Sequence, residues 1–139
     1  MRKFAFRLAK LLEYRRLQEK WAKDDFLSRR AKKIEGEKQV ELLKEKRIEA
    51  AGRTYATLDE KRAQEAYVAR LEDERRAFEA AVVVLAGEEE VARVKWLNFK
   101  KDAEALEKLR QKDFDLWTLE EQRRVQRELD EWSVQRRAS

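Results

Sequence analysis

The side chains of this sequence that could carry chemistry are charged or aromatic, because the chain contains no histidine and no cysteine. The usual ligands for zinc, copper and haem are therefore missing, as are the commonest general base and the thiol nucleophile. Carboxylates remain, but they are interspersed with 34 basic residues, as on solvated helix faces. We therefore expect no enzymatic activity, no bound metal and no cofactor.

The alternative chemistry is recognition, and its candidates gather near the two ends of the chain. Trp and Arg dominate the energetics of protein interfaces, and large exposed apolar groups usually mark an interaction surface. The candidates near the C-terminus are Arg110, Phe114, Trp117, Arg123, Arg124 and Arg127. The candidates near the N-terminus are Phe4, Phe6 and Leu8. Docking to another protein competes here with self-association and with packing against the first helix.

The composition predicts that long helices position these residues. Charged residues make up 45% of the chain, and there are three glycines and no proline. Without turn-forming residues, a chain has little means of building strands and hairpins. Richness in Ala, Glu, Lys, Leu and Arg at heptad spacing is typical of a coiled coil.

Two apolar seams support this prediction. Alternating steps of three and four from Val68 to Leu106 meet twelve positions, of which ten are apolar. After Leu106 the same steps meet mostly charged residues, and a weaker seam runs from Leu8 to Ala50. We predict an all-α fold, a long two-helix antiparallel coiled-coil hairpin in which the C-terminal helix overhangs its partner after Leu106.

Local signals place the helix boundaries within one elongated domain over residues 1–139. The first helix is expected over about residues 3–50, the turn over residues 51–57 and the second helix over about residues 58–135. Gly52 suits the left-handed position that ends many helices. A turn centred near Thr54 would place Phe4 opposite residues 103–106.

Two further local features carry expectations about packing. Thr57 and Glu60 match a capping box, in which the Thr57 hydroxyl accepts from the Glu60 N–H and the Glu60 carboxylate accepts from the Thr57 N–H. Gly36 costs the first helix about 1 kcal/mol of helix propensity. Its small size would let an aromatic side chain of the second helix approach, and both Phe78 and Trp96 are candidates.

The charge pattern favours a solvated helix surface over a nucleic-acid site. The net charge is +5, and acidic residues alternate with basic ones, in pairs such as Glu72–Arg76 and Glu89–Arg93. The longest apolar run, residues 80–86, is far too short to span a membrane. The first residues lack the hydrophobic core of a signal peptide, so we expect a cytoplasmic protein.

Both ends of the chain resemble one family. Residues 4–19 (FAFRLAKLLEYRRLQE) resemble the N-terminus of the FliJ flagellar type III export proteins. Residues 105–114 and 120–131 resemble the other recognisable part of that family. The resemblance implies a non-enzymatic antiparallel coiled coil, similar to the two-helix central stalk of rotary ATP synthases.

The resemblance also implies partners. A FliJ-like chain would bind the hexameric flagellar export ATPase, promote its ring assembly and activity, and link it to the cytoplasmic domain of the export gate and to export chaperones. It would associate with the inner membrane only through these partners, and it would bind no nucleic acid. Injectisome stalk proteins are close analogues, so the choice between the two export systems rests on the end motifs.

Mapped onto this chain, the resemblance assigns the ATPase contact to the two end sets named above. The gate contact would lie on the coiled coil nearer the turn, at Tyr67 and Leu71. The alternative function is a generic coiled-coil scaffold or chaperone that dimerises through its C-terminal helix.

Overall fold

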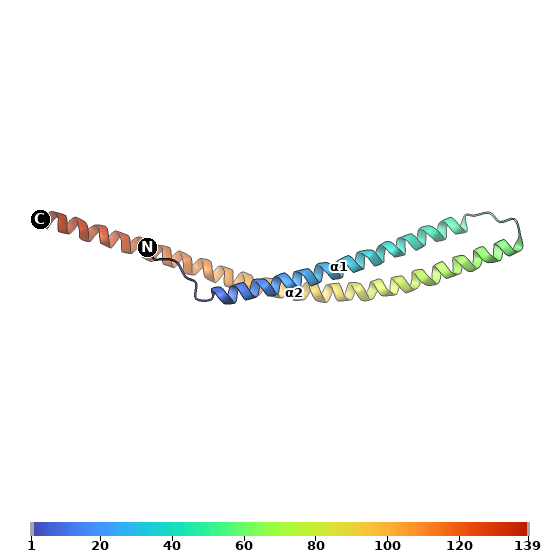
Figure 1. Ribbon diagram of the computed structural model, residues 1–139, viewed down its shortest axis with the longest axis horizontal. Helices are drawn as coiled ribbons and strands as arrows, with labels where there is room; N and C mark the ends of the chain where they lie inside the picture. Colours follow the sequence, from blue (N-terminus) through green and yellow to red (C-terminus); the bar gives the residue numbers. More distant parts are fainter. Residues whose placement is uncertain (1, 139) are drawn as a thin grey trace. The chain divides into compact units, whose positions relative to one another are not determined.

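The computed structural model describes residues 2–138, which form two long helices joined by a short linker (Figure 1). Helix α1 spans Ala9–Ala51 and helix α2 spans Leu58–Ala138. The two helices pack against each other, and the described residues include no strand. The predicted all-α helical hairpin is therefore confirmed.

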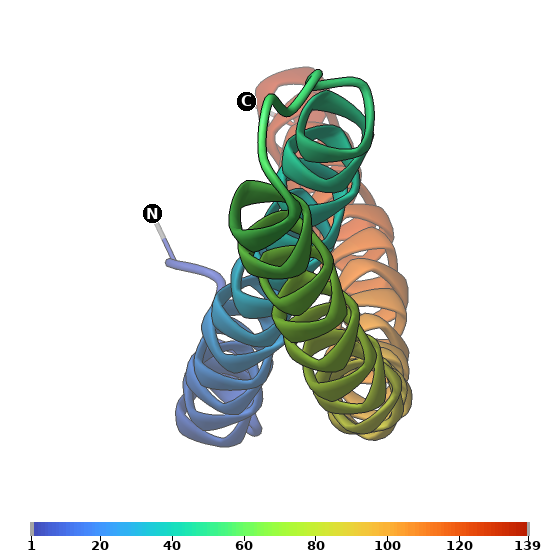
Figure 2. The ribbon, with the colours of Figure 1, turned by 90° about the vertical axis from the view of Figure 1, so that its right-hand side faces the viewer.

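The chain divides into two compact units, and each helix contributes to both of them. The first unit combines the N-terminal part of the chain up to Lys20 with the part that follows Trp96. The second unit comprises Trp21–Trp96 and contains the linker. Figure 2 views this second unit from the linker end, where the chain passes from α1 to α2.

The predicted seams are the buried faces of the helices. In the second unit, Phe26 and Val40 of α1 and Leu71 and Ala92 of α2 are all buried. The Trp96 ring stacks on Phe26, with ring centroids 5.5 Å apart and planes inclined by 18°. The alternating steps of three and four residues thus identified the packed faces correctly, because only one narrow face of each helix meets its partner.

Charged residues within the seams pair across the helices. Lys33 of α1 lies 2.5 Å from a carboxylate oxygen of Glu89, and Arg47 of α1 lies 2.7 Å from one of Glu72. The prediction had paired Glu72 and Glu89 with residues four positions later in their own helix. The Glu72 carboxylate also binds Arg75, three positions later in its own helix, at 2.7 Å, so it joins a cation of each helix.

The predicted register is wrong by roughly three helical turns. It placed Phe4 opposite residues 103–106, whereas the Phe4 ring contacts Phe114, with centroids 5.2 Å apart. In the second unit the same register would place Phe26 opposite Val82, whereas Phe26 stacks on Trp96. The prediction assumed that the two helices end level with each other at the turn.

The linker explains the shift. The Gln64 side chain, on the second turn of α2, donates to the Ala50 carbonyl at 2.5 Å and so satisfies a carbonyl at the end of α1. The first turns of α2 therefore extend past the end of α1, and residues 52–57 run alongside them (Figure 1). An extended residue advances about 3.3 Å and a helical residue about 1.5 Å, so six linker residues span several helical turns.

The two predicted signals at the linker are only partly correct. Gly52 follows the end of α1, but its backbone is not left-handed, since no described glycine has a positive φ. The Gly52 N–H instead donates to the Ile48 carbonyl at 3.1 Å. At the start of α2, the Glu60 N–H donates to the Thr57 hydroxyl at 3.2 Å as predicted. The Glu60 carboxylate accepts from the Ala56 N–H at 2.8 Å instead of from Thr57.

Helix α1 begins at Ala9, six residues later than predicted. Outside a helix, side chains two positions apart are not held to opposite faces, so Phe4 and Phe6 can both face α2. In a helix they would point roughly 200° apart, and only one could do so. Phe6 is buried and Phe4 packs on α2, so tertiary packing overrides the helix propensity of this segment.

Gly36 packs closely against an aliphatic side chain and not against either predicted aromatic. A β-carbon built on Gly36 would lie 2.9 Å from a methyl carbon of Val82 and 3.7 Å from one of Leu85. By contrast, a β-carbon at Gly87 would have no neighbour within 4 Å. Gly36 is therefore required by packing, whereas Gly87 is not.

The two glycines should respond to alanine in opposite directions. Gly87→Ala should raise the free energy of unfolding by about 1 kcal/mol through helix propensity alone. Gly36→Ala gains the same propensity but must displace the stiff Val82 side chain, so we expect a net loss of about 1 kcal/mol. Urea unfolding followed by circular dichroism measures both. Equal stabilisation by the two variants would contradict close packing at Gly36.

Candidate protein-interaction site

An aromatic cluster forms where the N-terminal segment meets α2. The Phe4 ring lies edge-on to Phe114 at 5.2 Å and tilted against Trp117 at 5.9 Å between centroids. Phe114 and Trp117 stack on each other at 5.9 Å, and the Arg110 guanidinium lies 5.8 Å from the Phe4 ring centroid. We call Phe4, Arg110, Phe114 and Trp117 the aromatic cluster.

The local sequence explains how the cluster forms. Arg110, Phe114 and Trp117 are spaced by four and three residues, so they share one face of α2. Phe4 reaches that face because residues 2–8 precede the first turn of α1. Two ends of the chain that are more than 100 residues apart in sequence therefore build one surface.

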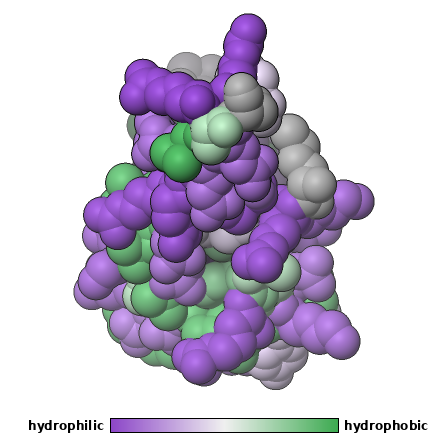
Figure 3. All heavy atoms as spheres, turned by 90° about the vertical axis from the view of Figure 1, so that its left-hand side faces the viewer, coloured by the Kyte–Doolittle hydropathy of each residue, from purple (hydrophilic) through white to green (hydrophobic). Residues whose placement is uncertain are grey.

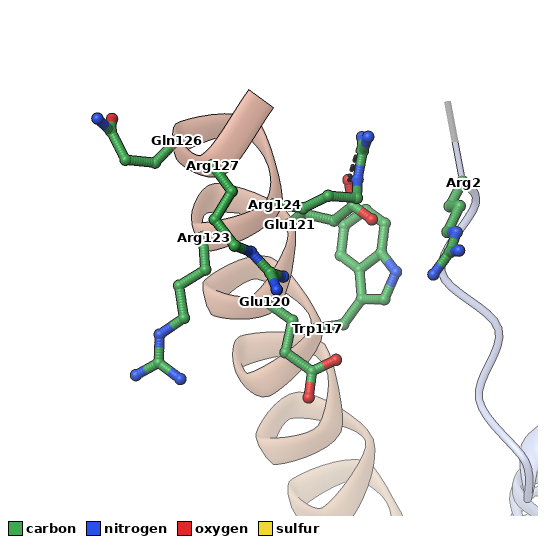
Figure 4. Close-up of a pocket in the computed structure, with 8 residues that line it drawn as sticks. All are labelled: Arg2, Trp117, Glu120, Glu121, Arg123, Arg124, Gln126 and Arg127. Carbon is green, nitrogen blue, oxygen red and sulfur yellow. Dashed lines mark hydrogen bonds and ion pairs between the residues drawn. The ribbon is translucent and has the colours of Figure 1, made fainter. Parts of the chain in front are cut away.

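A pocket adjoins the aromatic cluster (Figure 4). It has a volume of about 680 Å³ and combines one residue of the N-terminal segment, Arg2, with seven of α2. The α2 residues that line it are Trp117, Glu120, Glu121, Arg123, Arg124, Gln126 and Arg127. In Figure 4 the Trp117 side chain projects from α2 toward the segment that carries Arg2, whereas Arg123 and Gln126 point away from it.

The pocket carries an excess of positive charge. Arg124 forms ion pairs with Glu121 at 3.0 Å and with Glu128 at 2.6 Å. The hydrogen bonds that Arg124 donates to the Glu121 carboxylate hold the pKa of Arg124 above its ordinary value. Within residues 2–138, neither Arg2 nor Arg127 forms an ion pair with a carboxylate. These two guanidinium groups therefore remain available to an anionic partner.

The structure brings most of the predicted end residues into one region, but it buries some of them. Phe6 is 8% exposed and Leu8 is half-buried. At the other predicted contact, Tyr67 is half-buried with the Arg70 guanidinium 5.2 Å from its ring centroid. Leu71 is 3% exposed and packs in the seam, so its side chain does not reach the surface.

The overhang begins later than predicted, because the N-terminal segment covers part of the expected length. Phe114 and Trp117 both contact Phe4, although the prediction left α2 without a partner after Leu106. All described residues from 125 onward are exposed. Figure 3 shows this end of the chain, where hydrophilic side chains surround smaller hydrophobic patches. The large exposed apolar residues here are Val125, Leu129, Trp132 and Val134.

Sequence reasoning missed Arg2, Glu120 and Glu121 as residues of the pocket. The two glutamates looked like ordinary surface charges of a helix. Arg2 was expected near the start of α1, and its position depends on the non-helical course of residues 2–6. The spacing of Phe4 and Phe6 is the one signal that could have indicated this course.

Neither a metal site nor a membrane span is found in the part of the chain that the structure describes. No three or more acidic side chains there lie close enough together to hold a metal ion. Across residues 2–138, neither helix has a stretch apolar and long enough to cross a bilayer.

The family model described as flagellar FliJ protein matches residues 4–139 of this chain. The chain belongs to the FliJ family. No curated protein and no solved structure matches it. Its membership makes this chain a component of the flagellar protein export apparatus, in a family whose role there is non-catalytic. The resemblance of both end motifs to that family is thereby confirmed.

Proposed function

We propose that this chain is a coiled-coil stalk that binds the hexameric flagellar export ATPase, promotes its ring assembly and raises its activity. One observation carries the proposal: the two end motifs typical of the family lie in the same compact unit and meet at the aromatic cluster. A surface assembled from both ends of a chain is well suited to dock as one piece.

The chemistry of this unit supports a protein interface. Trp117 and Phe114 offer partly exposed aromatic surface, and Arg110 and Arg127 lie on the same helix. Aromatic residues supply buried contact area at interfaces, whereas basic groups set orientation and the rate of association. The exposed apolar residues at the end of α2 extend this surface beyond the N-terminal segment.

The link to the export gate and to export chaperones is part of the same proposal. Of the two residues first assigned to the gate contact, Tyr67 has partly exposed side-chain surface and Leu71 does not. Exposed Tyr55 and Leu58 adjoin the same end of the hairpin. We therefore place the gate contact at Tyr67 and its exposed neighbours. The chain would reach the cytoplasmic side of the inner membrane only through these partners.

Steady-state ATP hydrolysis by the purified export ATPase tests the proposal. Adding the chain should raise turnover and shift the ATPase to ring-sized particles on size exclusion, because a stalk held by several subunits favours the closed ring. Bovine serum albumin at the same concentration controls for non-specific stabilisation. No binding and no stimulation by a chain with its helical spectrum intact would contradict the proposal.

A scaffold that dimerises through its C-terminal helix is the second candidate. The observation that favours it is the row of exposed apolar residues Val125, Leu129 and Trp132, spaced by four and three on one face of α2. Sedimentation separates the two functions. Dimers that dissociate on dilution favour the scaffold, and a monomer at every concentration favours the stalk.

A further inference from the structure

We infer that the pocket between Arg2 and α2 binds an acidic segment of the export ATPase, with its carboxylates held by Arg2 and Arg127. This inference rests on the proposed function and adds the chemistry of the partner to it. The relevant pocket combines the N-terminal segment and α2 beside the aromatic cluster (Figure 4).

The charges of the pocket point to an anionic occupant. Four of its eight lining residues are arginines and two are glutamates. Arg124 is already bound by Glu121 and Glu128. Arg2 and Arg127 have no such partner among the described residues and come from the two different walls. A guanidinium binds carboxylates through paired N–H donors. A segment that carries Asp or Glu can therefore bind both Arg2 and Arg127.

Two features favour a protein segment over a nucleic acid. Glu120 and Glu121 lie in the same pocket, and they would repel the dense, regular phosphates of a nucleic acid. The Trp117 ring already packs against Phe4 and Phe114, so it offers less free surface for stacking a base. A segment with spaced carboxylates can avoid the two glutamates and still reach the arginines.

The two walls act together only because Phe4 fixes the N-terminal segment. Its ring packs on Phe114 and Trp117, two residues after Arg2 in the chain. Arg2 is thereby held across the pocket from Arg127 without a helix beneath it. The packing of residues 2–8 on α2 therefore contributes a charge to the pocket as well as an aromatic contact.

The direct test compares two double variants that remove the same charge. Arg2→Gln with Arg127→Gln should weaken ATPase binding roughly tenfold at low salt, and this difference should shrink at high salt. Arg30→Gln with Arg62→Gln removes two exposed arginines of the second unit and should bind like the wild type. If the ATPase binds the pocket variant as tightly as the wild type, the inference is overturned and the stalk function still stands.

A peptide experiment tests the anion-binding chemistry of the pocket separately from the ATPase. The probe is a synthetic helical peptide of Glu, Asp and Leu, followed by the indole N–H signal of Trp117 in NMR spectra of the full chain. A saturable shift that is absent with the Gln-substituted peptide and lost in the pocket variant supports the inference. No shift, or an equal shift in the pocket variant, overturns it. If a DNA duplex shifts the Trp117 indole signal at a lower concentration than the acidic peptide does, the choice of a protein segment is overturned.

Discussion

Replacing Trp117 by alanine should weaken binding of the flagellar export ATPase about 30-fold, which corresponds to about 2 kcal/mol. Trp117 is the residue shared by the aromatic cluster and the pocket. Its indole supplies contact area beside the arginines and supports the Phe4 ring, which holds the N-terminal segment. Biolayer interferometry with immobilised ATPase measures the change. We expect most of the loss of affinity to come from a faster dissociation rate.

Two other substitutions make this experiment specific. Trp21→Ala removes an indole that is 57% exposed on α1 and lies in the other unit, so it should leave ATPase binding unchanged. Trp117→Phe keeps a ring against Phe4 and should restore most of the affinity. If Trp117→Ala binds as tightly as the wild type, Trp117 does not contact the ATPase. If Trp21→Ala weakens ATPase binding equally, the ATPase contact is not specific to the aromatic cluster.

Replacing Phe26 by alanine should lower the free energy of unfolding by about 3 kcal/mol. Phe26 is 7% exposed and stacks on Trp96 within the seam. The substitution removes the ring, its stacking contact and the packing around it, and the flanking helices cannot close the space fully. Urea unfolding followed by circular dichroism gives the change as a lower midpoint.

The neighbouring residue provides the control for this prediction. Leu27 is 46% exposed, so Leu27→Ala should change the free energy of unfolding by less than about 0.5 kcal/mol. The two residues lie on different faces of the same helical turn, Phe26 in the seam and Leu27 toward solvent. A similar loss of stability in both would show that the seam does not run through Phe26. A negligible effect of Phe26→Ala would show that the ring contributes little to the packing.

The sequence was sufficient to predict the elements and the faces that they bury. Apart from Phe78, which is 39% exposed, the apolar steps from Val68 to Leu106 coincide with the packed face of α2, because a helix repeats every 3.6 residues whatever its partner. The start of α2 at Leu58 also followed from local chemistry, since the Thr57 hydroxyl caps the helix through neighbouring backbone atoms. The end motifs were likewise sufficient to indicate the family.

The sequence predicted the part of the candidate site that lies on the single helix α2. Arg110, Phe114 and Trp117 share a helix face by their spacing alone, so the sequence identified them together. That spacing does not indicate whether these side chains are exposed to solvent or covered by another segment of the chain. The contact with Phe4 depends on how far α2 is displaced along α1, and no local signal in the linker specifies this displacement.

The sequence by itself therefore determined the two helices, their seams and the composition of both ends. Only the tertiary structure decided the register, because the six linker residues let α2 start beyond the end of α1. It also decided that residues 2–6 stay outside helix α1, where Phe4 packs on α2 and Phe6 is buried. The pocket that joins Arg2 to Arg127 follows from these two long-range choices, which periodicity within one helix cannot encode.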